Sequence, residues 1–176
     1  MPKYRKMLND WQAPYIQSLM RLIETQSKIT LANWCLDYAE RMIVPIYEKQ
    51  CPGDSRPQNA LTAAREWLSG NMKLPEVKKI ILNECHAAAR ELDSNPTAQA
   101  AARTCGQAAS CIHAPTHSLG LAFYGALAVA YDKLGIDAEW DSLLSEAAEE
   151  CANMETALRA VAVENEPNPA KINWNC

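Results

Sequence analysis

The chain is poor in the residues that build catalytic loops and metal centres. Its 176 residues include only six glycines and three histidines. No stretch matches a phosphate-binding loop, the G-x-G-x-x-G dinucleotide fingerprint, the G-x-S-x-G nucleophile turn or the H-E-x-x-H zinc motif. Without a glycine-rich turn there is no evident oxyanion hole. We therefore expect a protein that is not an enzyme and that binds no cofactor.

The chain also lacks long apolar runs and an excess of positive charge. The longest strongly apolar segment, residues 119–131, is too short to span a bilayer. The N-terminal sequence MPKYRKMLNDW has no apolar core of the kind found in signal peptides. A net charge of −4 disfavours wrapping of a nucleic-acid backbone. We predict a cytoplasmic protein that binds neither membranes nor nucleic acids.

The cysteines show no pairing pattern, because they number seven and include no C-x-x-C. In a cytoplasmic protein such thiols stay reduced, and most of them serve as small buried side chains. We expect only Cys176, at the C-terminus, to be exposed.

Formal charge is absent from the middle of the chain. No Asp, Glu, Lys or Arg occurs between Thr104 and Tyr131. A segment of 28 residues without charge is not expected on the surface of a small protein, so we predict that it forms the interior. His113 and His117 lie within it, and their ring nitrogens require hydrogen bonds or a ligand there.

Alanine-rich segments with apolar residues at spacings of three and four predict helices throughout. Prolines, glycines and capping residues set the boundaries. The expected helices cover 4–26 with a start at Pro14, 30 to an end or kink at Pro45, 57–69, 75–92, 97–113, 115–134 and 137–163; Pro115 marks either a kink or a new start. We predict an all-α, single-domain bundle of six or seven helices over residues 1–163, around a central apolar Ala-rich helix pair, and an irregular tail at 164–176.

The last predicted helix has two different faces. Its apolar residues alternate at spacings of four and three, which predicts a seam that packs on the core of the same chain or on a second copy. Seven acids and no Lys or Arg occur between Leu134 and Leu158. They predict either a solvated face or a surface that attracts a basic protein partner. The candidate contact residues in this helix are Asp137, Glu139, Asp141, Glu146, Glu149 and Glu150.

The tripeptide Ala-Ala-Arg occurs three times, at 63–65, 88–90 and 101–103. Small residues allow close helix packing, so each arginine either extends from a helix edge into solvent or points inward. An inward guanidinium requires an acidic partner, for which Glu40 and Asp54 are candidates, or a ligand.

The three histidines allow a metal site as an alternative. His113 and His117 are one helical turn apart, and with His86 and a carboxylate they could hold zinc. Pro115 interrupts that turn, and buried histidines more often have their nitrogens satisfied within the core. A nucleophilic pair of Cys111 and His113 is disfavoured because residues i and i+2 diverge on a helix.

Four blocks of sequence, taken in order, resemble one family. They are W-x3-YAERM-x2-PIYE (34–48), P-x-D-x-RP-x5-AAREWLSG (52–70), CHAAAR (85–90) and AARTCGQAASCIHAPTHSLGLAFYG (101–125). The series resembles the immunity proteins of bacterial polymorphic toxin systems over about residues 30–135. The N-terminal helix within residues 1–28 and the tail lie outside the resemblance. The polar positions that recur in the family correspond here to Glu40, Arg41, Asp54, Arg56, Arg65, His86, Arg90, Arg103, His113 and His117, and Pro115 replaces a smaller residue.

The resemblance implies an all-α cytosolic protein that neutralises a toxin by binding it. We expect the cognate toxin to contact Asp54, Arg56 and the acids of the last helix. The other recurring polar residues would form an internal network, made of Glu40, Arg65, His86, Arg90, Arg103, His113 and His117. The alternative function is an internal ligand or metal site of His, Asp and Arg side chains, in a pocket lined by His86, His113, His117 and Asp54, with or without enzymatic activity. A homodimer through the apolar seam is a further possibility.

Overall fold

The computed structural model describes residues 4–174, and these consist of helices and loops without a strand. This confirms the all-α class. Residues 4–174 contain seven continuous helices, because three of them are α-helical pieces joined by a π-helical turn. The bounds are α1 Pro14–Ile23; α2 Lys28–Tyr38, η1 Ala39–Ile43 and α3 Val44–Gln50; α4 Arg56–Leu68; α5 Leu74–Ile80, η2 Ile81–Cys85 and α6 His86–Glu91; α7 Pro96–Ser110; η3 Pro115–His117, α8 Ser118–Gly120, η4 Leu121–Ala126 and α9 Leu127–Leu134; and α10 Trp140–Val161.

Local chemistry explains where the helices begin. The hydroxyl of Ser27 accepts a hydrogen bond from the Thr30 amide at 3.2 Å and caps α2. The Asn95 side chain accepts from the Ala98 amide at 3.1 Å and caps α7, whose first residue is a proline. Both arrangements satisfy amide groups that have no partner within the helix.

Two prolines have different effects on the chain. Pro45 neither ends nor interrupts its helix, because the π-helical turn η1 comes directly before it and the Val44 amide donates to Ala39. A π-helical turn absorbs one extra residue and so relieves the missing hydrogen bond of a following proline. Pro115, in contrast, starts a new helix with the 3-10 turn η3, and α7 already ends at Ser110. The helix expected over 97–113 is therefore shorter than predicted.

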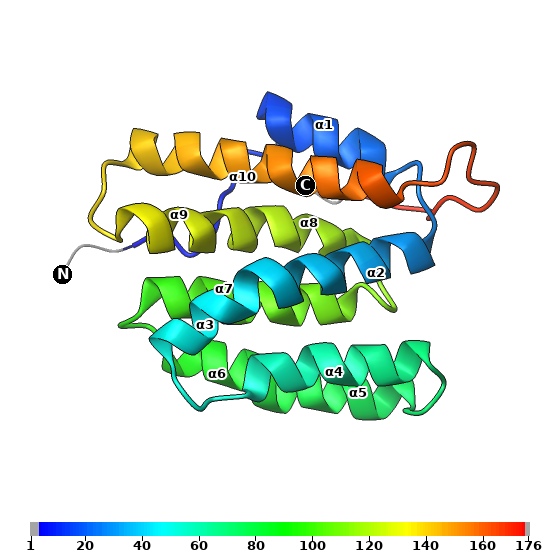
Figure 1. The fold of residues 1–176 in the computed structure, drawn as a ribbon, viewed down its shortest axis with the longest axis horizontal. Helices are drawn as coiled ribbons and strands as arrows, with labels where there is room; N and C mark the ends of the chain where they lie inside the picture. Colours follow the sequence, from blue (N-terminus) through cyan, green and yellow to red (C-terminus); the bar gives the residue numbers. More distant parts are fainter. Residues whose placement is uncertain (1–3, 175–176) are drawn as a thin grey trace.

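The helices lie in stacked rows (Figure 1). Helices α1 and α10 form one outer row and pack on the row of α8, η4 and α9. Next come α7 and the crossing helix of α2 and α3, and the helices α4, α5 and α6 close the opposite side. Within the described residues, no helix is long and apolar enough to cross a membrane.

Helix α7 is the centre of this arrangement. It packs against the helix of α2 and α3, against α4 and α6, and against the row of α8, η4 and α9, and 13 of its 15 residues are buried. The charge-free segment, residues 104–131, is interior along most of its length, as predicted. Its less buried residues lie near one edge, where α7, η3 and η4 meet; they are Gln107, His113, Ala114, Thr116, His117, Phe123 and Tyr124.

The apolar seam of α10 packs within the same chain, against α1, α2, η4 and α9. Ala147, Cys151, Met154 and Leu158 are fully buried there. The indole nitrogen of Trp34 donates to the Met154 carbonyl at 3.1 Å. The face that the sequence offered for a homodimer is therefore covered by the chain's own helices.

The thiols within the described residues are all free, and five of these six cysteines are buried. The thiols of Cys35 and Cys111 lie 3.3 Å apart in the core. Cys176, which the sequence predicts to be exposed, lies outside the described residues.

Candidate functional site

The sequence-predicted polar residues form three separate groups. The first joins α4 to the helix of α2 and η1 through Arg65. Its guanidinium donates to Glu40 at 2.9 Å and 3.2 Å and to the Asn33 side chain at 3.1 Å, and it also pairs with Asp37. Arg65 and Glu40 are each about one-third exposed. This group brings together one predicted arginine and its predicted acid, and it ties two helices together at the surface.

The second group fixes the loop between α3 and α4. Arg56 donates to Asp54 at 2.8 Å and to Glu91 of α6 at 2.9 Å, while the Tyr47 hydroxyl donates to Asp54 at 2.8 Å. The guanidinium of Arg56 lowers the pKa of Asp54 to about 2, with a further contribution from the Tyr47 hydroxyl. Asp54 and Arg56 thus contact each other while parts of both side chains remain exposed.

The third group is the His–Arg cluster, which we define as His86, Arg90, Arg103, His113 and His117. His86 begins α6, and the Cε1 side of its ring lies close to the backbone of α7 at Gly106. A Cβ atom at that glycine would lie 2.5 Å from Cε1 of the ring. Glycine at this position therefore permits the close approach of the imidazole to α7.

The other two imidazoles lie where η3 begins. The ring centroids of His113 and His117 are 6.0 Å apart, and Nδ1 of His117 lies 2.7 Å from Oε1 of Gln107. Burial lowers the pKa of all three histidines, and the charges of Arg103 and Arg90 lower the pKa of His86 further. The imidazoles are therefore mainly neutral at pH 7.

The cluster is not fully internal, and its hydrogen bonds are incomplete. Arg90 is exposed, whereas the other four members are partly buried. Nε of Arg103 and Nδ1 of His113 are buried and have no hydrogen-bond partner in the described structure. The guanidinium of Arg103 lies above the Tyr124 ring, 6.0 Å from its centroid. The sequence-based requirement for an acid beside every inward arginine therefore holds for Arg65 but fails for Arg103.

The metal site and the Cys–His pair considered as alternatives have no supporting geometry. Among residues 4–174, no group of three or more His, Cys, Asp or Glu side chains is placed to hold a metal ion, and this includes the three histidines. The thiol of Cys111 contacts Cys35 and the Gln107 carbonyl, not His113.

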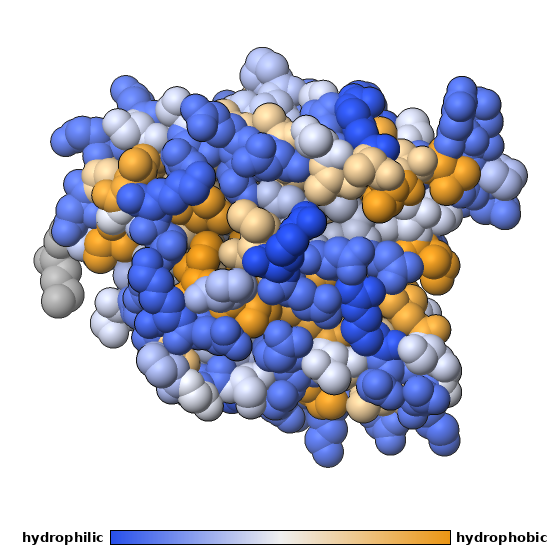
Figure 2. All heavy atoms as spheres, viewed as in Figure 1, coloured by the Kyte–Doolittle hydropathy of each residue, from blue (hydrophilic) through white to orange (hydrophobic). Residues whose placement is uncertain are grey.

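The acidic residues of α10 and of the turn before it divide into exposed and engaged ones. Asp137, Glu139, Asp141 and Glu149 are exposed. Glu146 pairs with Lys133 of α9 at 2.5 Å. Glu150 is only 1% exposed and accepts a hydrogen bond from the Tyr38 hydroxyl, so it does not belong to the acidic surface. Over the visible face of the molecule, hydrophilic side chains dominate and apolar ones form separate areas between them (Figure 2).

A groove that the sequence did not indicate lies beside the exposed acids. We call it the Trp140 groove; it has a volume of about 530 Å³ and separates the N-terminal segment from the start of α10. The Arg5 guanidinium lies over the Trp140 ring, 4.2 Å from its centroid. The other residues that line it are Leu8, Asn9, Asp10, Ala13, Pro14, Tyr15, Asp141, Leu144 and Ser145. Leu8 and Trp11 continue the helical spacing of α1, but the helix begins at Pro14 and residues 4–13 are irregular, so the spacing did not indicate that they lie along α10.

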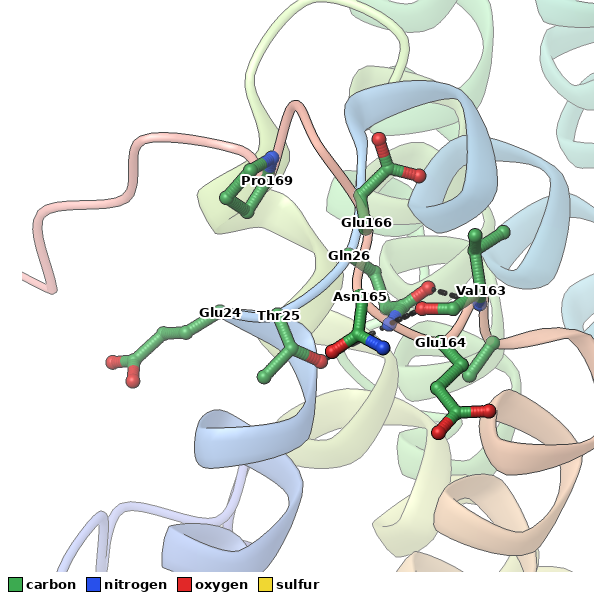
Figure 3. Close-up of a pocket in the computed structure, with 9 residues that line it drawn as sticks. Glu24, Thr25, Gln26, Val163, Glu164, Asn165, Glu166 and Pro169 are labelled. Carbon is green, nitrogen blue, oxygen red and sulfur yellow. Dashed lines mark hydrogen bonds between the residues drawn. The ribbon is translucent and has the colours of Figure 1, made fainter.

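A second hollow, of about 570 Å³, lies where the C-terminal segment crosses the turn between α1 and α2 (Figure 3). The buried Gln26 side chain accepts from the Val163 amide at 2.7 Å and donates to the Val163 carbonyl at 3.2 Å. The Gln26 carbonyl accepts from the Ala170 amide at 2.8 Å. These bonds explain the position of the segment after α10, so we assign this hollow a structural origin.

Comparison with known proteins identifies the family. A protein-family model described as "Imm-5 like putative immunity protein" matches residues 21–157. This range includes the four sequence blocks and extends beyond them at both ends, into α1 and through most of α10. No curated protein and no solved structure matches the chain. Because the match covers most of its length, the chain belongs to this Imm-5 like family.

Proposed function

We propose that this protein is a cytoplasmic, non-enzymatic immunity protein that neutralises a bacterial toxin by binding it and covering its active site. The observation that carries the proposal is the family match over residues 21–157. The structure is compatible with this role, because the described residues form a well-packed helical body. Binding would then require little ordering of the immunity protein itself, which favours affinity.

The surface that best suits such a partner is the Trp140 groove together with the exposed acids beside it. Arg5, Tyr15 and Trp140 are of the residue types that most often carry binding energy in protein interfaces. Asp137, Glu139 and Asp141 add negative charge next to these aromatic side chains. A toxin face with an apolar anchor and surrounding lysines or arginines would match both features and would be steered towards them.

The family match also favours this location as a determinant of specificity. The groove residues before position 21 lie outside the matched range, whereas Trp140, Asp141 and Leu144 lie inside it. A surface built partly from a segment outside the matched range can differ among family members there, and we propose this segment as a source of discrimination among toxins. Asp54 and Arg56 remain candidate contacts on the opposite side of α7, with a smaller expected contribution because they already pair with each other.

The proposal is tested by protection of cells. A toxin gene found beside the gene of this chain is expressed in a susceptible host, alone and together with the immunity protein. We expect growth to be restored by the wild type and to be reduced when Asp137, Glu139 and Asp141 are changed to lysine. Glu48→Lys, an exposed acid on α3, is the matched control. Full protection by the triple variant would exclude the acidic surface, and failure of the wild type to protect would exclude the proposed function.

A further inference from the structure

The His–Arg cluster carries positive charge without a counter-charge in contact. Within the described part of the chain, Arg90 and Arg103 form no ion pair. Asp93 is close enough for Arg103 to lower its pKa, but its carboxylate already accepts from Lys6 at 2.8 Å and from the Gln99 amide at 2.9 Å. By comparison, four other arginines are ion-paired, namely Arg21, Arg56, Arg65 and Arg159.

The unsatisfied groups of the cluster are donors or can become donors. Nε of Arg103 is an obligate N–H donor, and it is buried without an acceptor. Nδ1 of His113 is likewise buried without a partner. Buried polar atoms in folded proteins almost always have partners, so two such atoms in one cluster indicate a missing acceptor. Arg90 adds an exposed guanidinium on the neighbouring helix α6.

Beside the cluster lies a groove that is large enough for a small molecule. We call it the Trp174 groove; its volume is about 320 Å³, within the usual range of ligand sites. Gln107, which contacts His117, and Tyr124, which lies under Arg103, both line it. Phe123 and Trp174 contribute further aromatic surface. No member of the cluster lines the groove itself, but Gln107 of α7 and Tyr124 of η4 contact the cluster on one side and line the groove on the other.

We propose that the His–Arg cluster binds the oxyanion group of a small molecule, a phosphate or a carboxylate, whose aromatic or apolar remainder lies in the Trp174 groove. Phosphate and carboxylate oxygens are acceptors only, and guanidinium groups bind both in a bidentate manner. Such a ligand supplies the acceptor that Arg103 lacks and the negative charge that Arg90 and Arg103 lack. The site shares no lining residue with the Trp140 groove, and the proposal does not depend on toxin binding.

The experiment is a calorimetric titration of the full chain in a phosphate-free buffer with four probes: inorganic phosphate, phenyl phosphate, acetate and benzoate. We expect saturable binding of at least one pair of probes, either the two phosphates or the two carboxylates. The aromatic member of that pair should bind about fivefold more tightly than its parent anion, because the ring becomes buried in the groove. Binding of the phosphates alone or of the carboxylates alone would identify the anion class.

Variants link the binding to the cluster. Arg103→Gln and, independently, the exposed Arg90→Gln should each weaken the best probe about tenfold or more, because each removes charge-assisted hydrogen bonds. Arg159→Gln on α10 is the control and should bind like the wild type. Circular dichroism confirms that each variant is folded, and Arg90→Gln decides the matter if Arg103→Gln does not fold. Absence of saturable binding for all four probes, or wild-type affinity in the Arg90 variant and in any folded Arg103 variant, would overturn the proposal.

Discussion

The hydrogen bond between Tyr38 and Glu150 gives a sharp test of how α10 is oriented. The two side chains are 3% and 1% exposed, and Glu150 accepts in addition only from the Asn153 side chain at 3.2 Å. Replacing Tyr38 with phenylalanine keeps the ring and removes the hydroxyl donor. The carboxylate then stays buried with one weaker partner.

A buried hydrogen bond to a charged group contributes about 1.5–3 kcal/mol, so we expect Tyr38→Phe to lower the free energy of unfolding by about 2 kcal/mol. For a chain of this size that corresponds to a decrease in Tm of about 4–8 °C. The double variant Tyr38→Phe with Glu150→Met removes both polar partners. It should therefore be more stable than the sum of the single losses predicts, by about 1–3 kcal/mol.

Urea denaturation followed by circular dichroism measures these differences, with Glu149→Gln as the control. Glu149 is exposed, so its substitution should change the free energy of unfolding by less than about 0.5 kcal/mol. A Tyr38→Phe variant as stable as the wild type, with no coupling to position 150, would refute the buried position of Glu150. It would instead place this carboxylate on the acidic surface, as its sequence neighbours suggest.

Two further predictions concern packing and pH. Gly106→Ala adds a Cβ atom against the His86 ring, so it should destabilise the wild type by about 1 kcal/mol despite the higher helix propensity of alanine. In a His86→Ala background the same substitution should stabilise the protein by about 1 kcal/mol. Equal effects of Gly106→Ala on the free energy of unfolding in the two backgrounds, measured by urea denaturation, would contradict the close contact. Asp54 has a depressed pKa of about 2 in the folded state, so its contribution to stability is present above pH 4 and is lost as the pH falls to about 2. The difference in the free energy of unfolding between wild type and Asp54→Asn should therefore shrink between pH 4 and about pH 2. A constant difference would show that Arg56 does not stabilise the ionised form of Asp54 preferentially.

Helix positions could be predicted from the sequence because burial imposes a regular spacing on apolar residues. The seam of α10 from Ala147 to Leu158 is an example, and the cap at Asn95 and the start at Pro115 follow from local residue chemistry. The π-helical turns could not be predicted, because each adds a single residue, and such a shift is hidden by apolar spacings that already vary between three and four. For that reason Pro45 was only expected to end or kink its helix.

Side-chain environments were harder to predict than helices. Glu150 lies three residues after Ala147 and four before Met154, so its helical position already indicated burial, although its charge suggested the surface. The Trp140 groove depends on how the irregular segment before α1 lies along α10, which only tertiary contacts decide. The missing acceptor of Arg103 likewise follows from the arrangement of α6, α7 and η4 and not from spacing along the chain.

The most direct test of toxin neutralisation is a titration of the purified toxin's activity with this purified protein. We predict that inhibition is complete at one molecule of immunity protein per toxin and that the complex survives gel filtration. The association rate should fall with rising salt concentration and with the Asp137, Glu139 and Asp141 lysine substitutions, because exposed charges steer the encounter. An unchanged toxin activity at a large excess of the folded protein would contradict the proposed function.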